Sequence, residues 1–187
     1  QGYSSAASDV YKRQTVYRSS IQPIRLLTMQ TRNSAAYKGI MALILQDSPL
    51  DFMTGHRMDI ASYIDEDADI HHIFPQTYCE RKNLPRIKWN SVINKTPIYA
   101  SSNRSIGGHA PSIYIGTMAN KGLMQVQIQE AIESHKINYA HLVSDDFNAY
   151  FIDRAKQLLD RIEIATGKSV SGRDSEETIR EFGFSLI

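Results

Sequence analysis

The sequence has a single cysteine, Cys79, among its 187 residues. One thiol cannot form an internal disulfide, and it cannot supply the several thiolates that a structural zinc site usually needs. A metal bound by this chain would therefore be held by histidine, asparagine or carboxylate groups. Because the sequence pairs no base with Cys79, we interpret it as a small half-buried residue and not as a nucleophile.

Long apolar runs are also absent. No stretch approaches the roughly 18 residues that cross a bilayer, and no charged start followed by an apolar segment resembles a secretory signal. We therefore expect a protein of the cytoplasm that makes no contact with a membrane. Its length and its 42% of hydrophobic residues suffice for one sizeable core.

The chain has little net charge. The formal value of +1 is well below the basic balance of a free-standing DNA-binding protein. The charges are unevenly distributed, however, because residues 51–69 hold six acidic side chains and one arginine, whereas residues 80–104 hold six basic side chains and one glutamate. The second block is either a solvated loop or a segment that contacts phosphate.

Residues 4–14 read SSAASDVYKRQ, which is the translation of one frame of a common short-read sequencing adapter. A match of this length does not arise readily by chance. We interpret residues 1–14 as a non-native extension and exclude them from reasoning about the fold. We also expect the native protein to start upstream, with an N-terminal part that this chain lacks.

The hydrophobic spacing predicts helices on both sides of a short pair of strands. Asn33 and Ser34 are suited to cap a helix that ends at Ser48 and Pro49, and residues 58–64 predict a short helix or an irregular segment. Residues 70–74 predict a strand, residues 82–89 a loop, and residues 91–99 a return strand that a proline restricts to an edge or a bulge. Residues 101–108 predict a turn into a short helix that two glycines end.

The C-terminal half predicts further helices at residues 111–118 and 123–135, and a longer one that Ser144 caps and Gly167 ends. We expect an α+β fold in which a small two-stranded element is embedded in a mostly helical domain. The expected organisation is a helical lead-in at 15–68, a central unit at 69–120, packing helices at 121–170 and a loosely attached tail at 171–187.

The candidate chemistry lies in the run DIHHIFPQ at residues 69–76, which a basic segment and two spaced asparagines follow. Hydrolysis of a phosphodiester requires a base that activates water, a cation that offsets charge on the phosphate, and a group that orients the base. Histidine suits the first task because its pKa lies near neutrality. Two adjacent histidines alone would prove little, since histidines are more often structural or surface residues.

In this order the residues resemble the HNH, or His-Me finger, pattern of a strand, a loop, a second strand and a helix around one divalent metal ion. The resemblance extends to the HNH domain of RNA-guided CRISPR effector nucleases. It implies that His72 is the general base and that His71 and Asn103 are metal ligands. It further implies that Asn94 helps to orient the base or the scissile phosphate.

The chain departs from the CRISPR type at His71, where that family has aspartate, although colicin-type HNH nucleases also use paired histidines. Mg²⁺ or Mn²⁺ is the expected metal, and an imidazole ligand also admits Zn²⁺ or Ni²⁺. We choose Lys95 and Arg104 as phosphate contacts, with solvated side chains as the alternative. His109 follows the glycine pair and could reach such a metal, but we favour its interpretation as a histidine in a loop.

A wider resemblance covers nearly all of residues 15–168. Residues 33–38, 51–52, 110–112, 133–135 and 146–168, together with the HNH motif, are similar to the C-terminal region of GmrSD-type restriction proteins. This resemblance implies DNA as substrate, a role in bacterial anti-phage defence, and a ParB-like nucleotide-hydrolysing domain that precedes the nuclease. Two alternatives remain: a non-catalytic DNA-binding or regulatory module of the same fold, and an RNase or toxin with the same metal site.

Overall fold

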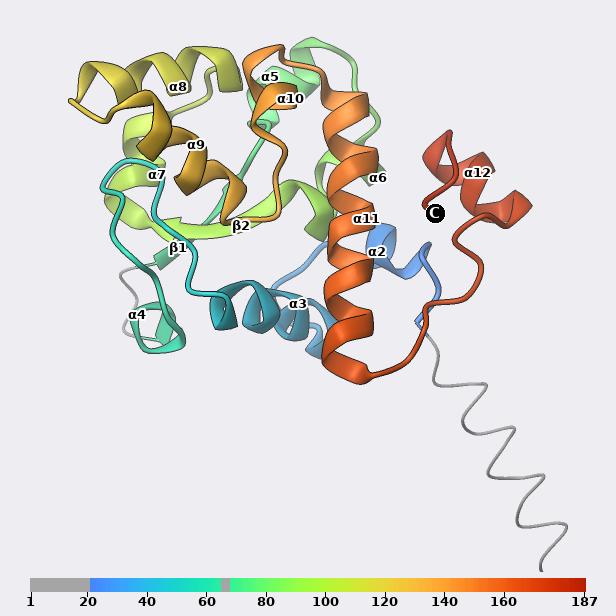
Figure 1. The fold of residues 1–187 in the computed structure, drawn as a ribbon. Helices are drawn as coiled ribbons and strands as arrows, with labels where there is room; N and C mark the ends of the chain where they lie inside the picture. Colours follow the sequence, from blue (N-terminus) through green and yellow to red (C-terminus); the bar gives the residue numbers. More distant parts are fainter. Residues whose placement is uncertain (1–20, 65–67) are drawn as a thin grey trace, which may run out of the picture.

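The computed structural model describes residues 21–64 and 68–187, which fold as an α+β unit (Figure 1). The predicted extension at residues 1–14 lies outside the described residues. The elements follow in the order α2 (Arg25–Thr28), α3 (Ala35–Gln46), α4 (Ile60–Ile64), β1 (Ala68–His72), α5 (Gln76–Arg81), α6 (Arg86–Trp89), η1 (Val92–Asn94), β2 (Lys95–Tyr99), α7 (Ala100–Ile106), α8 (Pro111–Asn120), α9 (Gln125–Glu133), α10 (Tyr139–Val143), α11 (Phe147–Thr166) and α12 (Glu176–Phe182).

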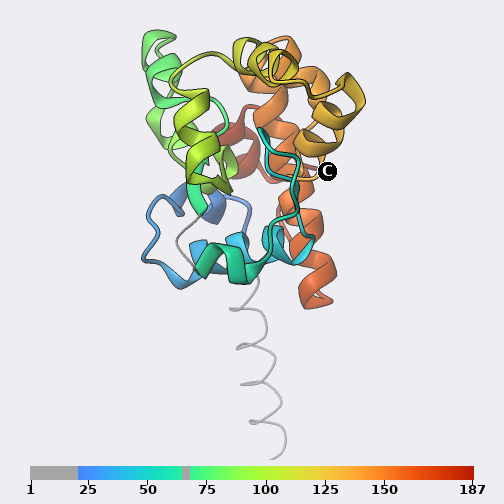
Figure 2. The same cartoon turned by 90° about the vertical axis from the view of Figure 1, so that its left-hand side faces the viewer.

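The two strands form an antiparallel sheet in which His71 faces Thr96 and His72 faces Lys95. Helices α8, α9 and α10 lie on one side of this pair, and α3 and α4 lie on the other (Figure 1 and Figure 2). In a two-stranded sheet every residue lies on an edge strand, so Pro97 fits within β2 without breaking a central ladder. Strand β1 begins and ends two residues earlier than the sequence predicts, because the chain turns after His72 to meet the Asn94 carbonyl through the Ile73 amide.

Local capping signals account for several helix ends. The Ser34 side chain accepts a hydrogen bond from the Tyr37 amide and starts α3 as predicted. Gly167 ends α11 in the left-handed conformation with φ of 65°, also as predicted. The predicted cap Ser144 is wrong: Asp146 caps α11 by accepting from the Ala149 amide, while Ser144 lies at the end of the short helix α10.

One prediction of irregular structure is also wrong. The segment predicted as a loop at residues 82–89 contains α6, which begins directly after Pro85. Residues 171–187, to which the sequence assigned no element, contain α12, where Ser175 supplies the cap. Phe182 and Leu186 are 3% and 0% exposed, so the end of the described chain packs onto the core.

The long helix α11 contributes the aromatic and aliphatic stripe that the sequence predicts as buried, including Phe147, Tyr150 and Leu159. It also buries Arg154, whose side chain is fully enclosed. The guanidinium donates to the carbonyls of Val92, Ile93, Lys95 and His135. A charge in the interior is tolerated only when its donors are satisfied, so Arg154 fixes the course of η1 and the start of β2.

Among the described helices, none is both long and apolar enough to cross a membrane.

Candidate functional site

Strand β1, the short helix η1 and helix α7 together carry the residues that the HNH resemblance singles out: His71 and His72, Asn94, and Asn103. Residues of β1, α5 and α7 line a pocket of about 200 Å³ beside the strand pair. Its walls include His71, His72 and Asn103, with Gln76 and Thr77 of α5 opposite. Three of the predicted site residues therefore border one small space.

A chain of polar contacts orients Asn103. Its amide nitrogen donates to Asp69 Oδ2 at 2.8 Å, and its amide oxygen lies 2.9 Å from His71 Nδ1. Arg32 pairs with the other oxygen of Asp69 at 2.8 Å. Hydrogen bonds and the Arg32 charge lower the pKa of Asp69 against the opposing effect of burial, so this carboxylate is ionised and only accepts. The Asn103 oxygen must therefore face His71.

His71 is almost completely enclosed, with 2% of its surface exposed. The rings of Phe52 and Tyr114 meet the imidazole edge-on, with centroids 5.8 and 5.7 Å away. Burial lowers the pKa of His71 to about 4, which keeps the ring neutral near pH 7. Within the described part of the chain its Nε2 has no hydrogen-bond partner, and such an atom in a protein interior calls for an explanation.

Helix α7 is held against the strands at the residue before Asn103. Ser102 donates to Asp51 Oδ2 at 2.6 Å, and the other oxygen of this fully buried carboxylate accepts from the Tyr99 amide at 2.7 Å. At the far end of the helix, Thr77 donates to the Gly108 carbonyl at 3.0 Å. A Cβ at Gly108 would clash with the Thr77 hydroxyl, so the close approach of α5 to the residues that follow α7 requires glycine.

His72 points to a different set of partners. Its Nε2 lies 3.2 Å from Asn90 Oδ1, the Asn90 amide donates to Gln30 Oε1 at 3.3 Å, and Gln30 donates to the Leu27 carbonyl at 3.1 Å. A carbonyl can only accept, so this chain of amides makes His72 Nε2 the donor and leaves the Nδ1 lone pair open. Burial is also the largest cause that lowers the pKa of His72, and the neutral ring is the form that can accept a proton.

Asn94 lies in the interior with 0% exposed surface. Its amide nitrogen donates to the carbonyls of Phe74 and Trp89 at 2.9 Å each, and its oxygen accepts from the Phe74 amide at 2.9 Å. Of the two expectations for Asn94, direct contact with a phosphate does not agree with this burial. The residue instead ties the turn after His72 to the end of α6, which is a way of orienting the base.

The remaining predicted residues differ in their placement. Lys95 is 6% exposed and donates to the Gln30 carbonyl at 2.7 Å, and burial lowers its pKa to about 8. This placement does not support the predicted phosphate contact. Arg104 is exposed on α7, so contact with phosphate remains the prediction for this residue. His109 is exposed and does not line the pocket, while Cys79 is fully buried and its pKa is raised to about 12 by burial, which agrees with a structural role.

The spacing of two donors in the pocket is compatible with one divalent ion. Two ligands about 2.1 Å from a metal and at right angles to one another are separated by about 3 Å, and His71 Nδ1 and Asn103 Oδ1 are 2.9 Å apart. In the described ranges no three His, Cys, Asp or Glu side chains form a group that could hold a metal. The fit therefore rests on one imidazole and one amide, with the other positions left to water and phosphate oxygens.

Sequence reasoning missed several residues that shape this site. Asp69 shares a strand face with His71 because residues two apart point the same way, and this alternation is a signal that the sequence contains. Asn90 gives no such signal, since its contact with His72 spans a loop. Arg86 also lies near the site: its guanidinium is over the Trp89 ring, and that ring meets the His72 ring edge-on at 5.9 Å.

The chain is similar to a protein of the archaeon Methanocaldococcus jannaschii, the uncharacterized protein MJ0686, with 30% identity over 159 residues. The alignment covers 73% of this chain but only 27% of the archaeal protein. No family model matches the sequence, and no solved structure matches it either.

Proposed function

We propose that this chain is the nuclease region of a DNA-cleaving protein, with an HNH-type site that depends on one divalent metal ion. The observation that carries the proposal is the contact of His71 on β1 with Asn103 on α7, beside His72 in the same pocket. The antiparallel strand pair followed directly by a helix supports it, because the HNH pattern consists of these elements in this order.

In this proposal His72 is the general base. Its Nδ1 accepts the proton of the attacking water, while Asn90 holds Nε2 and so fixes the tautomer. Asn94 keeps the turn after His72 in position through Phe74 and Trp89. The neutral state that burial favours for His72 makes the base available near neutral pH.

His71 and Asn103 hold the metal, and Asp69 and Arg32 orient the amide of Asn103. A bound divalent ion offsets the negative charge of the phosphate and of the leaving oxygen. His71 can bind a metal through Nδ1 only as the tautomer that carries its proton on Nε2, the nitrogen that has no partner among the described residues. Arg104, exposed on α7, and Arg86, exposed over the Trp89 ring, are the proposed contacts to the DNA backbone.

The resemblance to GmrSD-type proteins extends the proposal to restriction or anti-phage defence, in which a ParB-like domain acts with the nuclease. The chain spans about a quarter of its archaeal relative, 27% of that length, so the activity of a whole protein belongs to this proposal as well.

The test is cleavage of supercoiled plasmid DNA by the purified chain with Mg²⁺ or Mn²⁺, in parallel with chelator and with His72→Ala. The proposal expects nicking or cutting that requires the metal and that His72→Ala abolishes. Cleavage that persists in excess chelator, or that His72→Ala leaves unchanged, would refute it. An RNA substrate in the same assay separates the RNase alternative.

A further inference from the structure

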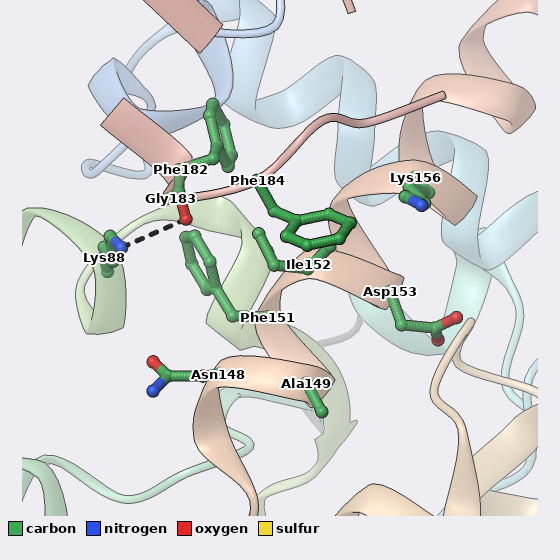
Figure 3. A pocket seen from close by; sticks show the side chains of 10 residues that line it. All are labelled: Lys88, Asn148, Ala149, Phe151, Ile152, Asp153, Lys156, Phe182, Gly183 and Phe184. Atoms are coloured by element: carbon green, nitrogen blue, oxygen red, sulfur yellow. Dashed lines mark hydrogen bonds between the residues drawn. The ribbon is translucent and has the colours of Figure 1, made fainter. Parts of the chain in front are cut away.

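A second cavity, which shares no lining residue with the pocket of His72, lies where α6, α11 and the end of α12 meet. Its volume is about 570 Å³, within the range of small-molecule sites. It is formed by α11, by the last residue of α12 and the two that follow it, and by Lys88 of α6 (Figure 3). Apolar side chains, among them Phe151, Ile152 and Phe184, line it together with two lysines.

Phe184 is the unusual member of this lining, because 63% of its surface is exposed. The residues on either side of it are anchored: Phe182 stacks on Phe151 with ring centroids 5.9 Å apart, and Leu186 is fully buried. Arg173 holds the segment by exchanging hydrogen bonds with Leu186. The chain is therefore fixed around Phe184 while the ring itself remains open to solvent.

The lysines add positive charge at this aromatic surface. The Lys88 amino group lies 5.7 Å from the centroid of Phe151 and donates to the Phe182 carbonyl at 3.4 Å. The Lys156 amino group lies 6.0 Å from the centroid of Phe184, and Figure 3 draws the two lysines on opposite sides of that ring. No described carboxylate is within ion-pairing distance of either lysine.

The acidic residue of the lining does not neutralise these cations. Asp153 accepts a hydrogen bond from Gln157 at 2.7 Å on its own helix. An open aromatic ring and two cations without an acidic partner match a ligand that is planar, aromatic and anionic. Nucleotides have this chemistry, and proteins bind unpaired nucleotides by stacking bases on aromatic rings beside cationic groups.

We propose that this cavity binds one nucleotide, with its base stacked on Phe184 and its phosphate held by Lys156 beside that ring, while Lys88 adds positive charge on the other side. The inference goes beyond the proposed nuclease, because it requires binding and no cleavage. The two sites share α6: Lys88 lines the cavity, while Trp89 and Asn90 contact His72. The nucleotide comes either from solution or from an unpaired position in a DNA strand.

The test follows the fluorescence of 2-aminopurine, which stacking on an aromatic ring quenches. The probes are 2-aminopurine deoxyribonucleoside 5′-monophosphate and a trinucleotide with 2-aminopurine at its centre, each titrated with the full chain in excess chelator. We expect saturable quenching. We expect the Kd to rise about tenfold in Phe184→Ala, which is the size of one lost stacking contact, and to rise also in the double variant Lys88→Gln with Lys156→Gln.

Matched controls are Phe184→Trp, which keeps a stacking surface, and Ile164→Ala and Lys38→Gln, which remove exposed side chains elsewhere. Each should bind as the parent chain does. Equal affinity for the two probes assigns the site to free nucleotides, and tighter binding of the trinucleotide assigns it to a DNA strand. Circular dichroism and melting temperatures identify any variant that is unfolded.

The proposal is overturned if quenching does not saturate at millimolar probe, or if a folded Phe184→Ala binds as tightly as the parent. It is also overturned if inorganic phosphate displaces the probe as well as the unlabelled nucleotide does, because only a charge site would then exist. Repeating the titration with His72→Ala separates the two proposals. Unchanged binding there, whatever the result of the plasmid assay, keeps the cavity independent of the nuclease.

Discussion

Asn103 donates from its amide nitrogen to the Asp69 carboxylate at 2.8 Å and thereby turns its amide oxygen toward His71. The carboxylate decides which end of the amide faces the pocket, because it can only accept. A residue that the motif did not assign thus sets the donor atom that Asn103 offers to a metal.

Asp69→Ala should therefore weaken the binding of Mn²⁺ about tenfold, as the loss of a residue that orients a ligand typically does. The amide of Asn103 would no longer be held with its oxygen toward His71. Isothermal titration calorimetry of the purified chain measures the change. Glu130→Ala, which removes an exposed carboxylate from α9, is the control, and equal affinity in both variants would contradict the positioning role.

Replacement of the two histidines should separate binding from chemistry. His72→Ala is expected to abolish plasmid cleavage and to leave Mn²⁺ affinity within about twofold, whereas His71→Ala and Asn103→Ala lower affinity and cleavage together. Calorimetry and the plasmid assay on the same three proteins provide the comparison. A similar loss of affinity in all three would show that the roles are wrongly assigned.

The contact between Asn90 and His72 predicts a shift in the pH profile of cleavage. Asn90→Asp places a carboxylate against the imidazole, which favours the charged ring and raises the pKa of His72. His72 then stays protonated up to a higher pH. The acid limb of the pH–rate profile should therefore shift to higher pH, and the cleavage rate at pH 6 should fall. Initial cleavage rates from pH 5.5 to 8.5 test this, and an unmoved acid limb would exclude His72 as the base.

The buried guanidinium of Arg154 predicts a large effect on stability. Arg154→Met removes the donors to the Ile93, Lys95 and His135 carbonyls and should lower the free energy of unfolding by about 3 kcal/mol. Urea denaturation followed by circular dichroism measures this. Arg180→Met, which removes a largely exposed arginine, should have little effect, and similar stability of the two variants would contradict the account.

His135 predicts how stability depends on pH. It is fully buried, donates from Nε2 to the Leu50 carbonyl at 2.7 Å, and accepts at Nδ1 from the Thr96 hydroxyl at 2.6 Å. Burial is the main cause that lowers its pKa from 6.5 to about 3. Below pH 6.5 the unfolded chain binds a proton that the folded chain does not, so stability should fall as the pH drops toward 3.

The slope for one such histidine approaches about 1.4 kcal/mol per pH unit, and His71 adds to it down to about pH 4. Urea denaturation at pH 8, 6 and 5 gives the measurement. His135→Gln retains a donor and an acceptor without a titrating ring and should flatten the dependence, whereas His56→Gln, at an exposed position, should preserve it. A parent chain equally stable at pH 5 and pH 8 would disprove this expectation.

Local signals in the sequence determined the elements that need only near neighbours. The Ser34 cap, the Gly167 end of α11 and the buried stripe of that helix follow from hydrogen bonds and side-chain spacing within a few residues. The order of strand, strand and helix was equally readable, and together with the contact of Ser102 with Asp51 it brings His71 and Asn103 to one pocket.

Tertiary structure decided the contacts between residues that are far apart in the sequence. Asn94 and Lys95 lie in a segment that reads as an edge strand, yet Arg154 and Gln30, from distant parts of the chain, contact this segment, and neither side chain is open to a phosphate. Residues 171–187 read as polar and loose, but their few apolar side chains found a surface on α11. Burial depends on which surfaces meet, and for contacts so far apart in the sequence no local pattern contains that information.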